Sequence, residues 1–337
     1  MTSRRTLTTI AILFGLCLWA LPAAANVKAS LCIYDPGGAN GDVFNLMKDY
    51  RAAAIAWGVD FELKPYTDEK TAAEDFKAGQ CTAALITGTR ARPFHKFSAT
   101  MEAMGALPTY GELKSLVSSL LSVKAAKLMK HKDYEVAGIW SAGAVYLFVR
   151  DREIDTAGEL AGQRLATLDF DKAAKTMVRQ IGASLVAADV GTFGGMFNNG
   201  SVMAAYAPAT AYKALELYKG IGSKGGIIRY PLAQMTLQLL TRTADLPEGF
   251  GQTSRGYAKK TFKAGLKVVR DAEKLVPAHH WIDIPQADKD RYDEMFLDVR
   301  IKLRDEKKVY HKTMLKLMRK VRCRKDGARA ECAEKRE

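Results

Sequence analysis

Two arginines, Arg90 and Arg92, directly follow a short apolar run at residues 81–87. The run has the length and composition of a buried strand, so both side chains are expected near the carboxyl end of that strand. In open α/β sheets, ligands bind at this end. A guanidinium group suits a carboxylate, because its parallel N–H donors match two oxygens. We therefore expect Arg90 or Arg92 to contact a ligand; a surface ion pair or a loop contact is the alternative.

A pair of aspartates, Asp169 and Asp171, flanks Phe170 at the end of another strand-like run, residues 164–168. Paired carboxylates can act as a general acid and base. The simpler interpretation is that one of them caps a helix starting at Lys172. The chain has no G-x-S-x-G and no H-E-x-x-H motif. We therefore expect no catalytic residue and no enzyme.

The histidines and cysteines do not form a recognisable metal motif. His279 and His280 are adjacent, so they cannot present like a metal pair spaced i, i+4 on a helix. Beyond residue 25, the cysteines are Cys32, Cys81, Cys323 and Cys332. Zinc is the alternative use of these thiols. Because no histidine lies beside them and no C-x-x-C occurs, we expect no metal and no cofactor.

An even number of cysteines in an oxidising compartment predicts two disulfide bonds. Cys32 and Cys81 open two strands that should be neighbours in one sheet, so a bond between them is geometrically plausible. Cys323 and Cys332 flank a polar loop and could close a short hairpin.

Residues 1–25 have the pattern of an export signal. Arg4 and Arg5 precede the apolar run Ile10–Leu21, and an A-x-A site ends at Ala25. A retained anchor is the alternative, but the run is too short to span a bilayer comfortably. We expect cleavage after Ala25 and a periplasmic location.

Positive charge is concentrated near one end of the chain. The sequence has a net charge of +14, and residues 301–337 hold 14 Lys/Arg against 6 Asp/Glu. A basic surface can attract nucleic acid or anionic lipid. An exported protein rarely meets nucleic acid, so we expect no such partner. A solvated helix face, or one near a membrane, is the preferred interpretation.

The elements that must position these groups begin with a βαβαβ pattern. Strand-like runs at 31–35, 60–64 and 81–87 alternate with helical segments. Asp35 and Asn40 follow the first strand, so they should share a rim with Arg90 and Arg92. Their Gly-rich loop fits neither a P-loop nor G-x-G-x-x-G. It could bring backbone close to a ligand or be only a tight turn.

Residues 134–208 repeat the alternation of strands and helices and predict a second lobe. Two strands, 134–143 and 144–150, would carry the chain across, and the run 235–240 could return. Trp140 and Tyr206 could wall in a ligand, although each could equally be core. We predict an α/β fold of two lobes, with mostly parallel sheets, flanking helices and a long C-terminal helix from Asp288 to about Arg322. The expected parts are lobe I (26–140 plus 230–275), lobe II (141–229) and a C-terminal helical segment with the basic tail (276–337).

Several short motifs occur in a fixed order within the second lobe. They are Ile139–Gly143, Gly158–Arg164, Gly182–Val186 and Phe197–Val202, followed by Pro208. This order resembles the periplasmic solute-binding proteins of TRAP transporters. Phe44–Tyr50 and Glu74–Cys81 resemble a further set of exported proteins described only as solute-binding. The resemblance implies a type II periplasmic-binding-protein-like fold, hinge closure on a solute, and a permease or envelope transport complex as partner.

The resemblance also marks positions where this chain differs. The TRAP family commonly has an arginine where this chain has Val145, its carboxylate-clamping arginine where this chain has Ala166, and an acidic residue at Met203. An arginine is the natural bidentate partner of a carboxylate. If Arg90 contacts an anion, it would therefore replace the arginine missing at Ala166.

These patterns predict a periplasmic protein that binds a small solute as part of a transport system. The expected ligand contacts are Asp35, Asn40, Arg90 and Arg92 from the first lobe and Trp140, Asp169 and Tyr206 from the second. Two alternatives remain. One is a scaffold protein of an envelope transport complex that uses the basic C-terminal helix, and the other is an exported enzyme that uses Asp169 and Asp171.

Overall fold

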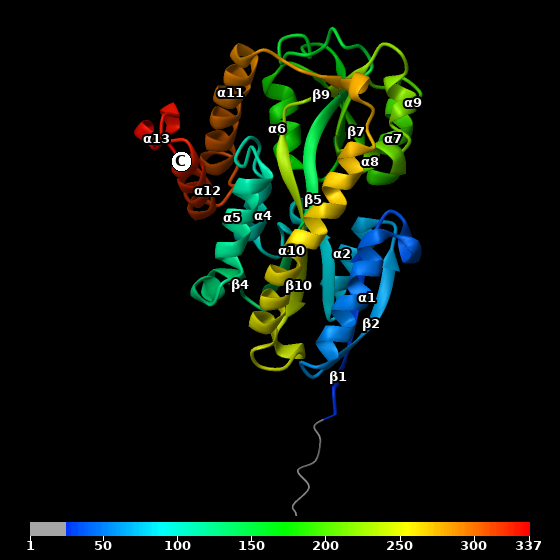
Figure 1. The fold of residues 1–337 in the computed structure, drawn as a ribbon, viewed down its shortest axis with the longest axis vertical. Coiled ribbons are helices and arrows are strands. Elements are labelled where there is room, and N and C mark those ends of the chain that lie inside the picture. The colour runs from blue at the N-terminus through cyan, green and yellow to red at the C-terminus, as the bar shows by residue number, and fades with distance from the viewer. Residues whose placement is uncertain (1–24) are drawn as a thin grey trace, which may run out of the picture.

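The computed structural model describes residues 25–337 and has two lobes, which share one mixed sheet (Figure 1). The main path of strands is β2-β1-β3-β10-β5-β8-β6-β7. Pairing is parallel at both flanks and antiparallel around β10 and β5 in the middle. The predicted leader lies almost entirely outside the described residues. None of the helices in residues 25–337 is long and apolar enough to cross a bilayer.

The first lobe forms as its sequence pattern predicts. Its parallel strands and their connecting helices are β1 (Val27–Tyr34), α1 (Asp42–Ile55), β2 (Val59–Tyr66), α2 (Glu69–Ala78) and β3 (Ala83–Thr87). The side chain of Asp68 caps α2, and Gly79 ends that helix in the left-handed conformation. Cys32 and Cys81 form the predicted disulfide.

Short helical elements and one hairpin strand complete this lobe. They are η1 (Gly38–Asn40), α3 (Gly88–Ala91), α4 (Lys96–Ala99), η2 (Thr100–Glu102), α5 (Tyr110–Leu120), η3 (Val123–Met129), β4 (Lys130–His131), η4 (Thr243–Asp245) and the start of α10 (Phe250–Lys274). Helix α10 runs diagonally across both lobes (Figure 1).

One long strand, β5 (Tyr134–Val149), replaces the two strands expected at 134–143 and 144–150. Residues 134–145 of this strand pair with β10 (Ala233–Arg242). The expected turn is a bulge, because Met235 pairs with Gly143 and Thr236 with Ser141. Gly143 has φ +114°, which a side chain would disfavour. The Ser141–Gly143 stretch that suggested a turn is therefore an irregularity within one continuous strand.

The second lobe is built from short strands around the far half of β5. Its elements are β6 (Arg164–Leu168), α6 (Lys172–Gln180), β7 (Ser184–Ala188), α7 (Val190–Asn198), β8 (Ala204–Pro208), α8 (Ala211–Ala214), α9 (Tyr218–Ile221), β9 (Gly226–Ile228), η5 (Ala278–His280) and β11 (Trp281–Ile282). Strands β6, β7 and β8 are parallel to one another, as the βα alternation predicted.

The helix expected from Asp288 to about Arg322 is two helices, α11 (Gln286–Asp305) and α12 (Lys312–Lys325). Between them Lys308 has φ +55°, and the backbone N–H of Val309 donates to the carbonyl of Leu303. The His311 side chain then caps α12. Buried apolar residues occur on both sides of this break, which is why the pattern reads as one helix.

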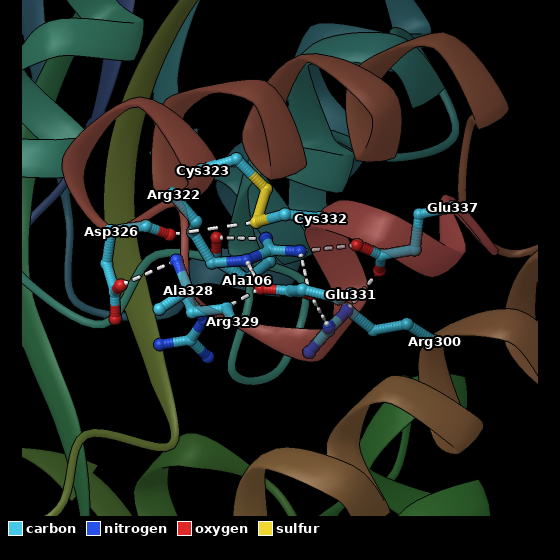
Figure 2. Close-up of a disulfide and its surroundings, with 10 residues drawn as sticks. All are labelled: Ala106, Arg300, Arg322, Cys323, Asp326, Ala328, Arg329, Glu331, Cys332 and Glu337. Carbon is cyan, nitrogen blue, oxygen red and sulfur yellow. Dashed lines mark hydrogen bonds and ion pairs between the residues drawn. A yellow bond between two sulfur atoms is a disulfide. The ribbon is translucent and has the colours of Figure 1, made fainter.

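The chain after α12 folds back as α13 (Ala330–Glu334), held by the predicted Cys323–Cys332 disulfide (Figure 2). Beside it lies a buried charge cluster of Arg300, Arg322, Glu331 and Glu337. Arg300 also donates to the carbonyl of Met104, and Arg322 to that of Ala106. The expectation of a solvated basic tail is therefore wrong for Arg322, which is fully buried.

Candidate functional site

Arg90 reaches from the first lobe to the second. It lies on α3, directly after β3, where the Thr87 hydroxyl accepts a hydrogen bond from the Arg90 backbone N–H. Its guanidinium carbon lies 3.3 Å from the centre of the Phe170 ring, which follows β6 in the second lobe. Its Nε atom is 3.6 Å from a carboxylate oxygen of Glu69. Arg90 therefore combines a cation–π contact between lobes with an ion pair inside its own lobe.

Arg92 lies against the C-terminal segment. Its guanidinium carbon is 5.7 Å from the ring centre of Tyr310, a buried residue in the break between α11 and α12. Burial raises the pKa of the Tyr310 phenol, while Arg92 lowers it and Asp171 raises it further. The electrostatic coupling indicates that residues from the first lobe, the second lobe and the C-terminal segment come close together here.

Several buried polar atoms near these arginines have no hydrogen-bond partner. Within residues 25–337, five of the seven such side-chain atoms are Arg90 Nε, Arg92 Nε, Gln234 Oε1, Gln234 Nε2 and Tyr310 OH. Gln234 is only 1% exposed. An unpaired buried polar group is costly and rare in native proteins. Arg90 Nε still has its ion pair with Glu69, so the hydrogen-bonding capacity left over is mainly that of Arg92, Gln234 and Tyr310.

Gln234 belongs on the same side of the sheet as the polar groups around α3. It lies on β10 opposite Ala144, and Thr236 and Gln238 share its face by strand alternation. The Thr236 hydroxyl donates to Glu102 over 2.8 Å. Arg92 acts electrostatically on Glu102, so Gln234 lies two residues along β10 from a hydrogen-bond partner of a group that is coupled to Arg92.

Two buried carboxylates, Glu69 and Glu102, lie beside the arginines. Glu69 accepts from the backbone N–H of Thr87 over 2.6 Å. Glu102 accepts from the backbone N–H groups of Gly88 and Thr236 over 2.9 and 2.7 Å. Burial raises the pKa of both carboxyl groups, and the nearby arginines oppose that rise. The site therefore pairs two cations with two acidic groups.

Asp35 and Asn40, expected on the same rim, have different surroundings. The Asp35 carboxylate accepts from the backbone N–H groups of Gly37 and Phe44 over 2.8 and 2.9 Å, so it shapes the Gly-rich loop. Asn40 is exposed at the end of η1.

A methyl group at Gly41 would overlap both carboxylate oxygens of Asp35. Because Gly41 has an ordinary φ of −73°, any effect of Gly41→Ala comes from this overlap. We expect the free energy of unfolding to fall by about 2 kcal/mol, measured by urea denaturation. Gly195→Ala on α7 is the matched control, since nothing lies within 4 Å of its added Cβ atom. Equal stability of the two variants would contradict the prediction.

The expected residues of the second lobe are dispersed. Asp169 is exposed, and its carbonyl accepts from Lys175 Nζ over 2.5 Å. Asp171 caps α6 by accepting from the backbone N–H groups of Ala173 and Ala174, as the simpler interpretation of the sequence held. Of this pair, Asp171 is the one coupled electrostatically to Tyr310.

The two expected aromatic contacts, Tyr206 and Trp140, both use their polar atoms inside the protein. The Tyr206 hydroxyl accepts from the backbone N–H of Leu168 over 3.1 Å, and burial, helped by Asp171, raises the pKa of this phenol. The Trp140 indole N–H donates to Thr261 Oγ1 over 3.0 Å. Trp140 pairs with Leu237 on β10, so it lies on the face opposite Gln234. Its ring packs in the core of the first lobe, away from the arginines.

Sequence reasoning missed Phe170, Gln234 and Tyr310 as members of the site. Phe170 carried a signal, because it lies between two aspartates at a strand end. The alternation of Gln234 with Thr236 in an apolar strand was a second signal. Tyr310 gave none, because it lies in a stretch that reads as helix.

Solved structures of similar fold include TRAP periplasmic solute-binding proteins. One from Ralstonia eutropha H16 has bound (S)-2-acetolactate, a TM-score of 0.72 and 13% identity, with 88% of this chain and 98% of that chain covered. One from Rhodoferax ferrireducens has bound malonate, a TM-score of 0.72 and 14% identity, with 89% of this chain and 100% of that chain covered. The type II two-lobed fold is thereby confirmed.

Residues 51–337 match the family model of the solute-binding proteins AdeT 1/2. The chain is 38% identical to the probable solute-binding protein AdeT1 of Acinetobacter baumannii over 301 residues, which are 89% of this chain and 99% of the relative. AdeT2 of the same organism is 24% identical over 229 residues, or 68% of this chain and 96% of the relative. The chain belongs to the AdeT 1/2 family of solute-binding proteins.

Proposed function

We propose that this solute-binding protein holds a small solute with an anionic group between its lobes, and that Arg90 and Arg92 contact the anion. The observation that carries the proposal is the set of five buried polar atoms on Arg90, Arg92, Gln234 and Tyr310 that have no hydrogen-bond partner in the described residues. A carboxylate on the solute would accept from the arginine N–H groups, and a neutral hydrogen-bonding group would pair with Gln234 and Tyr310. The carboxylates bound in the similar solved structures support the same chemistry.

Acidic groups beside the arginines limit how much negative charge the site can accept. Glu69 lies 3.6 Å from Arg90, and Arg92 opposes the rise that burial causes in the pKa of Glu102. A solute with one anionic group therefore meets less repulsion there than a polyanion. The contact of Arg90 with Phe170 joins the lobes, so a solute that binds Arg90 would also act on their closure.

The lobe boundaries, the location and the transport partner follow from the same role in solute binding. We propose lobe I as residues 26–140 plus 230–275 and lobe II as residues 141–229. Export with cleavage after Ala25, a periplasmic location, delivery to a membrane permease and the absence of catalysis belong to the proposal. The capping role of Asp171 supports the last point, because its carboxylate oxygen is already used by two backbone N–H groups.

Arg90→Ala should weaken solute binding at least about 100-fold while the protein stays folded, since truncating a buried charge contact typically costs a few kcal/mol. A thermal-shift screen of carboxylates and their uncharged amide analogues would identify the solute, because a ligand that binds the native state stabilises it. Calorimetry would then give the dissociation constants of the parent and the variant.

Arg179→Ala on the exposed face of α6 is the control for loss of positive charge. It should leave the affinity unchanged. Unchanged affinity in Arg90→Ala, or equal stabilisation by carboxylates and their amides, would contradict the proposed contact between the arginines and the anion.

A further inference from the structure

A basic and apolar surface lies on η3 and the hairpin turn that follows it. We define the η3 patch as Val123, Lys124, Lys127, Leu128 and Lys132, all of them exposed. Val123 is 73% exposed and Leu128 is 42% exposed, and Val123 is the most exposed large apolar residue among residues 25–337.

The segment around the η3 patch has an unusual charge pattern. Residues 113–132 contain five lysines and no acidic residue. Lys130 is 3.7 Å from the carboxylate of Glu135. Lys124, Lys127 and Lys132 make no ion pair with any residue of the described part of the chain. Three ammonium groups are therefore available to an external anion.

The η3 backbone is held by contacts on its inner side, and this directs the patch side chains outward. Ala125 and Met129 of the same 3-10 helix are buried beneath it. The Gln252 side chain of α10 donates to the carbonyl of Leu121 just before η3. Lys132 turns the chain with φ +52° into β5. The inner side chains of η3 therefore pack against the first lobe, and the patch residues face outward.

We propose that the η3 patch docks the protein on an anionic phospholipid surface. Aliphatic side chains flanked by lysines are the composition of interfacial membrane contacts, where the apolar groups enter the headgroup layer and the ammonium groups meet phosphates. Protein interfaces are instead enriched in aromatic residues and arginine and depleted in lysine. The η3 patch has neither an aromatic residue nor an arginine, so its composition favours a bilayer over a protein partner.

Docking through this patch would hold the first lobe and leave the second lobe free. Strand β4, which directly follows η3, lies on the first lobe at the end opposite β9 and α9 (Figure 1). The strands that connect the lobes, β5 and β10, lie between the patch and the second lobe. The protein would therefore keep its closing motion while bound.

Sedimentation with vesicles tests the proposal on the full chain. The parent protein should bind vesicles that contain phosphatidylglycerol and should not bind vesicles of phosphatidylcholine alone. The triple variant Lys124→Gln, Lys127→Gln, Lys132→Gln should bind about a hundredfold more weakly, at about fivefold for each lysine. Val123→Ser with Leu128→Ser should weaken binding several-fold without changing its dependence on salt.

A second triple variant on α10, Lys259→Gln, Lys260→Gln, Lys263→Gln, is the matched control, because these lysines are exposed on another surface. It should keep at least most of the parental binding, and all variants should unfold at the parental temperature. Equal loss in the control, or equal binding to both kinds of vesicle, would overturn the proposal. Retention on immobilised polyglutamate without binding to the anionic vesicles would overturn it in favour of an acidic protein partner.

Discussion

Arg322→Met is expected to lower the free energy of unfolding by about 3–5 kcal/mol. Arg322 is fully buried and donates to Glu331 over 2.6 Å, to Glu337 over 2.5 Å and to the carbonyl of Ala106 over 2.6 Å (Figure 2). Its loss leaves Glu337 with Arg300 as its cation, while Glu331 keeps Arg300 and the partly exposed Arg329. Urea denaturation at neutral pH measures the effect.

Arg324→Met is the control, since Arg324 is exposed on the same helix, and we expect a change within about 0.5 kcal/mol. Adding Glu331→Gln and Glu337→Gln to Arg322→Met should recover part of the stability, because the unpaired charges are then removed. A single variant as stable as the control would show that the cluster carries little free energy.

The same cluster has a defined pH dependence. Burial raises the pKa of Glu331, but the hydrogen bond and charge of Arg322 outweigh it and bring the pKa to about 2, below the ordinary 4.5. A carboxyl whose pKa is lowered in the folded state contributes its full stability above the ordinary pKa and loses it as the pH falls. The parent should therefore lose this contribution between about pH 4.5 and pH 2.

The second large effect is expected for Glu102→Ala, at about 3 kcal/mol or more, since each unpaired buried donor costs about 1–3 kcal/mol. Glu102 accepts from the backbone N–H groups of Gly88 and Thr236 and from the hydroxyls of Thr89 and Thr236. Because Gly88 begins α3, the loss should also displace Arg90 and weaken solute binding. Urea denaturation and calorimetry measure the two effects.

Glu102→Gln separates hydrogen bonding from charge. Oε1 of Glu102 receives three of the four hydrogen bonds, and the amide oxygen of glutamine can keep them. Its cost should be about 1 kcal/mol, the typical worth of one hydrogen bond. If Glu102→Gln were as unstable as Glu102→Ala, the buried charge rather than the four donors would explain the role of Glu102.

The order of strands and helices could be predicted from the sequence because it is a local property. An apolar run, a cap such as Asp68 and the glycine that ends α2 are each recognised from a few neighbouring residues. The Cys32–Cys81 bond followed from the neighbouring strands that those runs imply.

The features that the sequence did not predict depend on contacts between residues far apart in the chain. The continuity of β5 is decided by its ladder with β10, about a hundred residues later in the chain. At the break before α12, Tyr310 lies against Arg92 of the first lobe, a contact between distant residues that no periodicity reveals. Arg90 could be placed at a strand end from the sequence, but its contact with Phe170 required both lobes.

The ladder between β5 and β10 sets the mechanics of the protein. A two-stranded ribbon resists stretching and shear, since both would break several hydrogen bonds at once, but it bends easily where pairing is already irregular. The ladder has two such points, opposite Met235/Thr236 and opposite Leu239/Leu240. We therefore expect the lobes to move mainly by bending of this ribbon at its two irregularities, with the pairing between them kept.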